Sequence, residues 1–179
     1  MKKTVIFLLM VAFSFSGCEK DDICDADTPT TPRLVISFFD SNTPELAKKV
    51  TDLKVIGDGM EDGIIFNENA IGEAKFRTSG TSISIPLKTI EDSCSYTFIL
   101  NDGSTNATLT NQDKIEVFYT RNNVYVSRAC GFKTIFQLDT QKPFLRTDGA
   151  NADGFWMKSV RLENPNIEFE NETHIKVYF

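Results

Sequence analysis

Histidine and tryptophan are nearly absent from this chain of 179 residues, which contains one of each, His174 and Trp156. A lone histidine cannot supply the paired imidazoles of a typical zinc site, and no Cys-x-x-Cys pair is present to replace them. A Ser-His-Asp triad would need His174 beside a nucleophile and an acid, and no strained nucleophile motif accompanies it. We therefore predict no metal site, no cofactor and no enzymatic activity, and we interpret His174 as a surface or strand-end residue.

Basic residues are outnumbered by acidic ones, 19 against 25, which gives a formal net charge of −6 at pH 7. An acidic chain lacks the basic face that binds phosphate backbones, so we expect no nucleic-acid partner. The same charge argues against docking to anionic lipid headgroups. Beyond the N-terminus, no apolar run is long enough to form a transmembrane helix.

A short apolar run does occupy the N-terminus, and it ends at a cysteine. A lysine pair precedes it, residues 5–15 are mostly apolar, and residues 16–17 are small. These are the three parts of an export signal, and the apolar part is too short to span a bilayer. Because Cys18 follows at once, we predict a lipoprotein signal peptide over residues 1–17 and lipidation at Cys18. The alternative is an ordinary secretory peptide with a chance cysteine nearby.

Residues 18–32 read as a lipidated tether, first acidic and then rich in proline and threonine. Its beginning is similar to the signal with which Bacteroidota export lipoproteins to the cell surface, carried here by Lys20, Asp21 and Asp22. The resemblance implies an outer-membrane protein that is held by its lipid and faces the cell surface. A merely solvated tether, or a retention signal of the kind found in other bacteria, remains the alternative.

Lipidation of Cys18 would leave three cysteines, Cys24, Cys94 and Cys130, in an oxidising compartment. One disulfide and one free thiol are expected, and loop entropy does not distinguish the two long-range pairings with Cys130. Alternation along residues 94–100 places Cys94 on an apolar face, where a reduced cysteine packs as a small hydrophobe. This favours Cys24–Cys130, and Cys94–Cys130 remains open.

The rest of the chain predicts one all-β domain, residues 33–179. Short strand patterns recur between turn signals, with hairpin turns at residues 101–103 and 121–123, and Pro86 indicates a sheet edge or a strand end. We predict an immunoglobulin-like antiparallel β-sandwich. The predicted strands are residues 34–39, 53–56, 64–66, 74–77, 82–87, 95–100, 105–110, 114–120, 124–127, 132–138, 155–162 and 174–179.

Two further motifs have competing interpretations. Residues 151–154 resemble part of a calcium loop, but the ligand positions at both ends of the loop fall on unsuitable residues, so we interpret them as a turn. Phe155 and Trp156 follow that turn and are the best candidates for a glycan-binding aromatic platform. Packing of Trp156 in the core is the competing interpretation.

Several segments together resemble an uncharacterised lipoprotein family of Bacteroidota, domain of unknown function 6452. They are residues 18–24, 31–36, 129–132, 164–165 and 177–179. The resemblance implies that Cys24 and Cys130 pair and that Cys94 lies outside the family pattern. It transfers no catalytic residue.

These observations leave three hypotheses about function. The first is a membrane-anchored, non-enzymatic protein of the cell envelope or surface that interacts with an unidentified envelope protein. The second is an accessory module that binds a ligand, with glycans as the candidates. The third and weakest is an enzyme whose site only the fold assembles.

Overall fold

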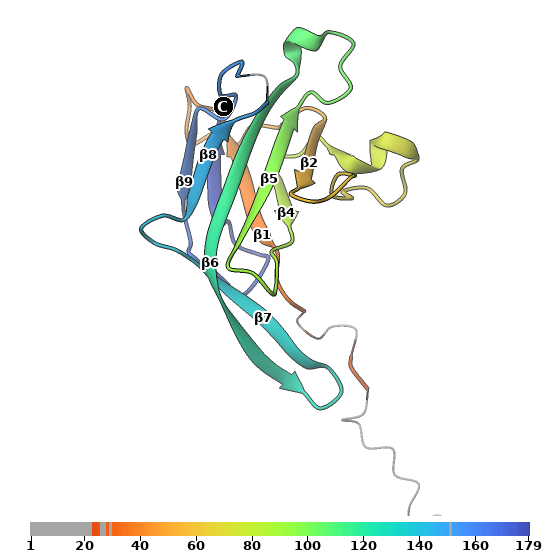
Figure 1. Ribbon diagram of the computed structural model, residues 1–179, viewed down its shortest axis with the longest axis vertical. Helices are drawn as coiled ribbons and strands as arrows, with labels where there is room; N and C mark the ends of the chain where they lie inside the picture. The colour runs from red at the N-terminus through yellow and green to blue at the C-terminus, as the bar shows by residue number, and fades with distance from the viewer. Residues whose placement is uncertain (1–22, 26–27, 29, 151) are drawn as a thin grey trace, which may run out of the picture. The chain divides into compact units, whose positions relative to one another are not determined.

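The computed structural model describes residues 23–25, 28, 30–150 and 152–179, and it consists mainly of β-strands (Figure 1). The chain divides into two compact units. The larger comprises residues 31–123 and 134–179, and the smaller combines the N-terminal segment up to Thr30 with Val124–Lys133. The predicted signal peptide and Cys18 lie outside the described residues.

The first sheet of the larger unit has four strands in the order β4-β1-β11-β9. β1 lies between two neighbours and is buried along most of its length, as its apolar residues on both faces predict. β4 lies at the edge and ends just before Pro86, which cannot donate a ladder hydrogen bond. The strands are β1 Leu34–Phe39, β4 Ser82–Ile85, β9 Ser159–Leu162 and β11 Ile175–Tyr178.

The first and last strands of the chain pair in parallel. Ile36 lies opposite Ile175 and Phe38 opposite Val177, whereas β4 and β9 run antiparallel to their neighbours. The prediction of a wholly antiparallel sandwich is therefore wrong for this pair. A hairpin turn forces two strands to run antiparallel, but β1 and β11 are joined through the whole of the intervening chain and are free of that constraint.

The second sheet has the order β10-β7-β6-β5-β2-β3, with β8 also paired to β6. β6 can take several partners because it is 17 residues long, and Figure 1 shows it between β5 and β8. The strands are β2 Leu53–Gly57, β3 Arg77–Thr78, β5 Ser93–Leu100, β6 Asn111–Ser127, β7 Gly131–Leu138, β8 Phe144–Asp148 and β10 Asn166–Ile167.

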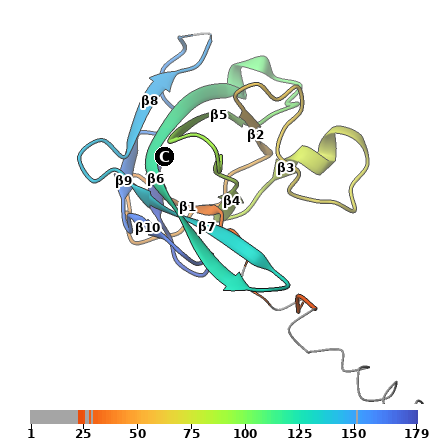
Figure 2. The same cartoon turned by 60° about the horizontal axis from the view of Figure 1, so that its bottom comes forward.

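One hydrophobic core lies between the two sheets, with β5 and β2 on one side of it and β1 and β4 on the other (Figure 2). Alternation along each strand supplies it: in β5 the side chains of Cys94, Tyr96 and Phe98 are buried, and those between them are partly exposed. Both sheets contribute fully buried side chains, among them Ile36, Phe38, Val177, Val55, Phe98 and Ile115. The chain is therefore an all-β protein with two sheets over a shared core.

The predicted hairpin at residues 101–103 exists, but its second strand begins later than expected. Asn101 and Gly103 have positive φ values of 55° and 75°, and β5 pairs with β6 beginning with Leu100 opposite Asn111. Residues predicted as a strand form instead an irregular loop with the short 3₁₀-helix Ala107–Leu109, which Asn106 caps through its side chain. This local side-chain bond competes with strand pairing and delays the ladder.

The turn predicted at residues 121–123 is wrong. β6 continues through these residues, and Thr134 on β7 donates a hydrogen bond to the side chain of Asn123 at 2.9 Å. The chain reverses later, at Gly131, whose φ of +70° is a left-handed conformation that glycine adopts without strain. Ladder pairing therefore overrides the turn preference of the asparagines.

Three other strand predictions also differ from the structure. Residues 64–66 are irregular, and most of residues 74–77 belong to the 3₁₀-helix Gly72–Phe76. Residues 155–158 precede β9 rather than belonging to it, and β8 is a strand that the sequence patterns miss.

Among the residues that the structure describes, no helix has the length and apolar character needed to cross a membrane.

The smaller unit is a β-hairpin end joined to the N-terminal segment by a disulfide. The hairpin strands are the last residues of β6 and the first of β7, and Ser127 accepts the backbone N–H of Cys130 at 3.0 Å. Tyr125 and Phe132 stack edge to face, with 5.4 Å between their ring centroids, although 59% and 69% of their surfaces are exposed. This unit holds its aromatic rings outside any large core.

Candidate functional site

The predicted sites at the N-terminus fall partly outside the described residues. This holds for Cys18 and for the candidate export residues Lys20, Asp21 and Asp22. The next predicted pair is present: Cys24 and Cys130 form a disulfide with a Cα–Cα distance of 5.0 Å across 106 residues of chain. The alternative pairing of Cys94 with Cys130 is wrong.

Cys94 is a buried free thiol, as its place on the apolar face predicts. Only 5% of its surface is exposed, and burial raises the pKa of the thiol. It lies beside Tyr96 and Tyr119, whose hydroxyls donate to the backbone carbonyls of Pro86 and Lys88. A buried thiol with a raised pKa is a poor nucleophile, so Cys94 is a packing residue.

The aromatic pair Phe155 and Trp156 does not form a platform. Trp156 is 7% exposed, donates its indole N–H to the Phe98 carbonyl at 3.3 Å, and packs edge to face against Phe179. Core packing, the competing interpretation, is correct for Trp156, because this buried carbonyl gives its indole N–H a partner. Phe155 is 43% exposed, and the guanidinium of Arg146 already covers its ring at 4.0 Å.

His174 lies at a strand end, directly before β11, as one of its two predicted positions requires, but it is buried, so the other predicted position, at the surface, is wrong. Its exposed fraction is 1%, and its Nδ1 accepts the backbone N–H of Val35 at 2.9 Å. Burial lowers the pKa of the imidazole, which is therefore neutral and carries its proton on Nε2. The ring can be buried because Val35 supplies a partner for the nitrogen that lacks a proton. His174 ties the start of β11 to β1 and is not a catalytic base.

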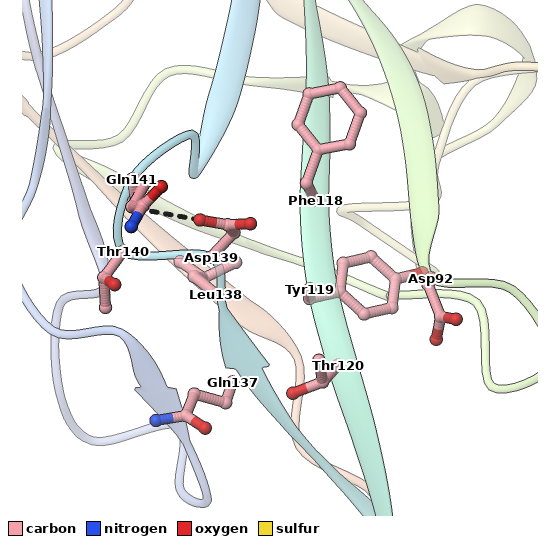
Figure 3. Close-up of a pocket in the computed structure, with 9 residues that line it drawn as sticks. All are labelled: Asp92, Phe118, Tyr119, Thr120, Gln137, Leu138, Asp139, Thr140 and Gln141. Atoms are coloured by element: carbon pink, nitrogen blue, oxygen red, sulfur yellow. Dashed lines mark hydrogen bonds between the residues drawn. The ribbon is translucent and has the colours of Figure 1, made fainter.

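A hollow of about 520 Å³ opens beside β6 and β7 in the larger unit. In Figure 3, Phe118, Tyr119 and Thr120 lie along β6, and Gln137, Asp139 and Gln141 face them across the opening. Asp139 accepts the backbone N–H groups of Lys142 and Gln141, and these bonds lower the pKa of its carboxyl group. Asp139 therefore stays ionised and is fixed in its turn, so it presents a negative charge to the hollow.

Asp113 is the functional candidate that the sequence patterns did not reveal. It is fully buried on β6, and its Oδ2 accepts the backbone N–H of Met157 at 2.8 Å. Burial raises the pKa of this carboxyl group to about 6, although the bond from Met157 opposes the shift. A signal was available: extending the alternation of Ile115 and Val117 backward by one step places Asp113 on the core face.

This raised pKa makes the stability of the protein depend on pH. The unfolded carboxyl group releases its proton near pH 3.8 and the folded one near pH 6, so the stability that Asp113 provides below pH 3.8 is lost as the pH rises through 6. We expect Asp113→Asn to raise the free energy of unfolding by about 1–3 kcal/mol at pH 7 in a chelating buffer. This gain in stability should disappear below pH 4. Urea unfolding across this pH range tests the prediction, and an equal gain at pH 3.5 and pH 7 would contradict it.

Comparisons with known proteins identify a family. Neither a curated protein nor a solved structure matches the chain. A family model described as a family of unknown function, DUF6452, matches residues 52–179, which extend from the start of β2 to the end of β11 and include both sheets apart from β1. The match covers the motifs at residues 129–132, 164–165 and 177–179 and most of the chain. The chain therefore belongs to the DUF6452 family of unknown function.

Proposed function

We propose that this protein is an exported lipoprotein of a Bacteroidota-type outer membrane, anchored by acyl chains on Cys18. The observation that carries the proposal is the Cys24–Cys130 disulfide. Structural disulfides persist in oxidising compartments and are rare in the cytosol, so the bond supports export. With Cys94 buried as a free thiol, Cys18 is the cysteine left for another role, and it directly follows the export-signal pattern.

The β-domain acts, in this proposal, as a non-enzymatic interaction module at the cell surface. Two sheets over one core, an immunoglobulin-like arrangement in our interpretation, form a rigid scaffold whose loops and edges are open to a partner. The absence of catalysis is supported by His174, whose acceptor nitrogen is occupied by Val35. The polar hollow beside β6 offers a place for a protein loop or a small glycan.

Metabolic labelling with an alkyne palmitate tests the anchor. We expect Cys18→Ala to abolish labelling and to release the protein from the membrane fraction, since the other free thiol, Cys94, is buried. Cys94→Ala is the matched control, because it removes a buried thiol and should leave labelling unchanged. Labelling that survives in Cys18→Ala would refute the anchor.

Surface exposure has its own test on the same cells. Replacing Lys20, Asp21 and Asp22 by alanine should protect the protein from protease added to intact cells. The control replaces Glu61 and Asp62, exposed acids of a loop in the larger unit, and should leave digestion unchanged. Digestion of the triple variant at the wild-type rate would remove the surface-export part of the proposal.

A further inference from the structure

We propose that Asn111, Asp113 and Asp148 form a binding site for a divalent cation, with calcium as the best match. Each of these side chains has a buried oxygen, Oδ1, without a hydrogen-bond partner among the described residues. A buried acceptor without a donor is costly, and native proteins hold few of them. Three such unpaired oxygens close together indicate that a positively charged ligand is missing.

Strand geometry brings the three oxygens to one face of the second sheet. Asn111 and Asp113 are two residues apart on β6, so their side chains point to the same side. Asp148 lies directly opposite Asp113 on the antiparallel strand β8, and opposed residues of such a pair share a face. The register of β6 with β8 therefore brings these three side chains together.

Backbone contacts orient each side chain so that one oxygen stays unpaired. The Asn111 amide donates to the Gly154 carbonyl at 2.8 Å, and the Gly154 N–H donates to Asp148 Oδ2 at 3.0 Å. Met157 likewise occupies Oδ2 of Asp113. A flip of the Asn111 amide would place its oxygen against the Gly154 carbonyl, so the flip cannot relieve the unpaired Oδ1. The oxygens are thus positioned before any ligand binds.

Gly149 allows the two strands to approach at this point. Its N–H donates to the Gln112 carbonyl at 2.8 Å, and a Cβ atom at Gly149 would lie 2.3 Å from that same carbonyl oxygen. Any other residue would push β8 away from β6. The glycine next to Asp148 therefore holds the unpaired oxygens of the two strands at the same end of the ladder.

The charge around the site favours a cation. Asp148 and Asp153 both repel the charge on Asp113, and Arg146 is the cation that attracts it. The guanidinium of Arg146 has other contacts, since it donates to the Met157 carbonyl and stacks on Phe155. Asp113 and Asp148 near one arginine leave a negative excess around the buried Asp113, and a bound divalent ion would neutralise it.

The donor set selects a hard ion. Two carboxylates and an amide oxygen suit Ca²⁺, which accepts 6–8 oxygens in flexible geometry and can complete its shell with water. Zinc prefers nitrogen and sulfur, and the described residues hold no group of three or more His, Cys, Asp or Glu side chains arranged for a metal. The third oxygen of the site comes instead from the amide of Asn111.

Calorimetric titration and thermal unfolding of the full-length protein after EDTA treatment test the site. We expect CaCl₂ to bind with a stoichiometry of one and, at a hundredfold excess over its Kd, to raise Tm by about 5–10 °C. Mg²⁺ should bind more weakly because it demands a regular octahedron. Asp148→Asn should weaken calcium binding at least tenfold, whereas Asp62→Asn, which removes the same charge from an exposed loop, should not.

Two results would overturn the proposal. One is an unchanged Tm with no heat of binding in 5 mM CaCl₂ at pH 7.5. The other is an equal response of the wild type and both Asp113→Asn and Asp148→Asn, which would place the ion elsewhere. Asp113→Asn serves as the second variant because it is expected to fold at least as stably as the wild type without calcium. Its calcium response should nevertheless be lost.

Discussion

Replacing Cys24 and Cys130 by serine is expected to lower the free energy of unfolding by about 4–5 kcal/mol. The bond closes 106 residues of chain, which include both sheets up to β6, and a loop of that length restricts the unfolded chain strongly. The stacked rings Tyr125 and Phe132 of the smaller unit remain largely exposed, so they contribute little burial to its stability. Guanidinium unfolding followed by far-UV circular dichroism measures the difference.

Reduction of the wild type provides the check on this effect. Dithiothreitol should destabilise the wild type by about the same amount as the double substitution and should leave the variant unchanged. Cys94→Ala is the control for loss of a sulfur from the core, at about 1 kcal/mol, since it removes one buried atom and opens no loop. If the free energy of unfolding of the double variant lies within 1 kcal/mol of the wild-type value, the disulfide does not restrict the unfolded chain strongly.

Phe38→Ala should cost about 3–5 kcal/mol, the range for deleting a large aromatic ring from a core. Phe38 is completely buried in β1, and its ring lies 6.4 Å from that of Trp156 and 6.3 Å from that of Phe179. These neighbours come from distant parts of the sequence, so they cannot collapse into the cavity without moving the strands. Urea unfolding followed by circular dichroism gives the value.

The neighbouring Phe39 is the matched control. It points to the other face of β1, is only partly buried, and stacks on Tyr178 with 5.6 Å between ring centroids. Phe39→Ala should therefore cost less than about 2 kcal/mol. Equal costs for the two substitutions would mean that the core does not lie on the Phe38 face of the strand.

The sequence predicts this fold best where one face of a strand is buried. Alternation placed Cys94 on the core face, and Pro86 correctly indicated the end of an edge strand. The asparagines at residues 122–123 are typical of a turn, but here the pairing of β6 with β7 outweighs their turn propensity. Parallel pairing of β1 with β11 could not be read from any local signal, because it joins opposite ends of the domain.

The candidate sites divide in the same way. The disulfide was predictable only as the favoured of two pairings, since side-chain alternation on one strand placed Cys94 on an apolar face but left its pairing with Cys130 open. The places of Trp156 and His174 depend on backbone partners at Phe98 and Val35, which are remote in sequence. The unpaired oxygens of Asp113 and Asp148 become visible only through the register of two strands, one of which the patterns missed.

If the chain is exported as we propose, the parallel ladder between β1 and β11 also bears on how it crosses the membrane. Ile36 must find Ile175, so the first sheet cannot close until residues 175–178 have emerged from the ribosome. Contacts of such long range form late and slowly. A secretion channel admits only extended chains, and a domain whose opening strand waits for its closing strand stays extended during synthesis. The topology thus favours delivery of an unfolded chain and folding only after export.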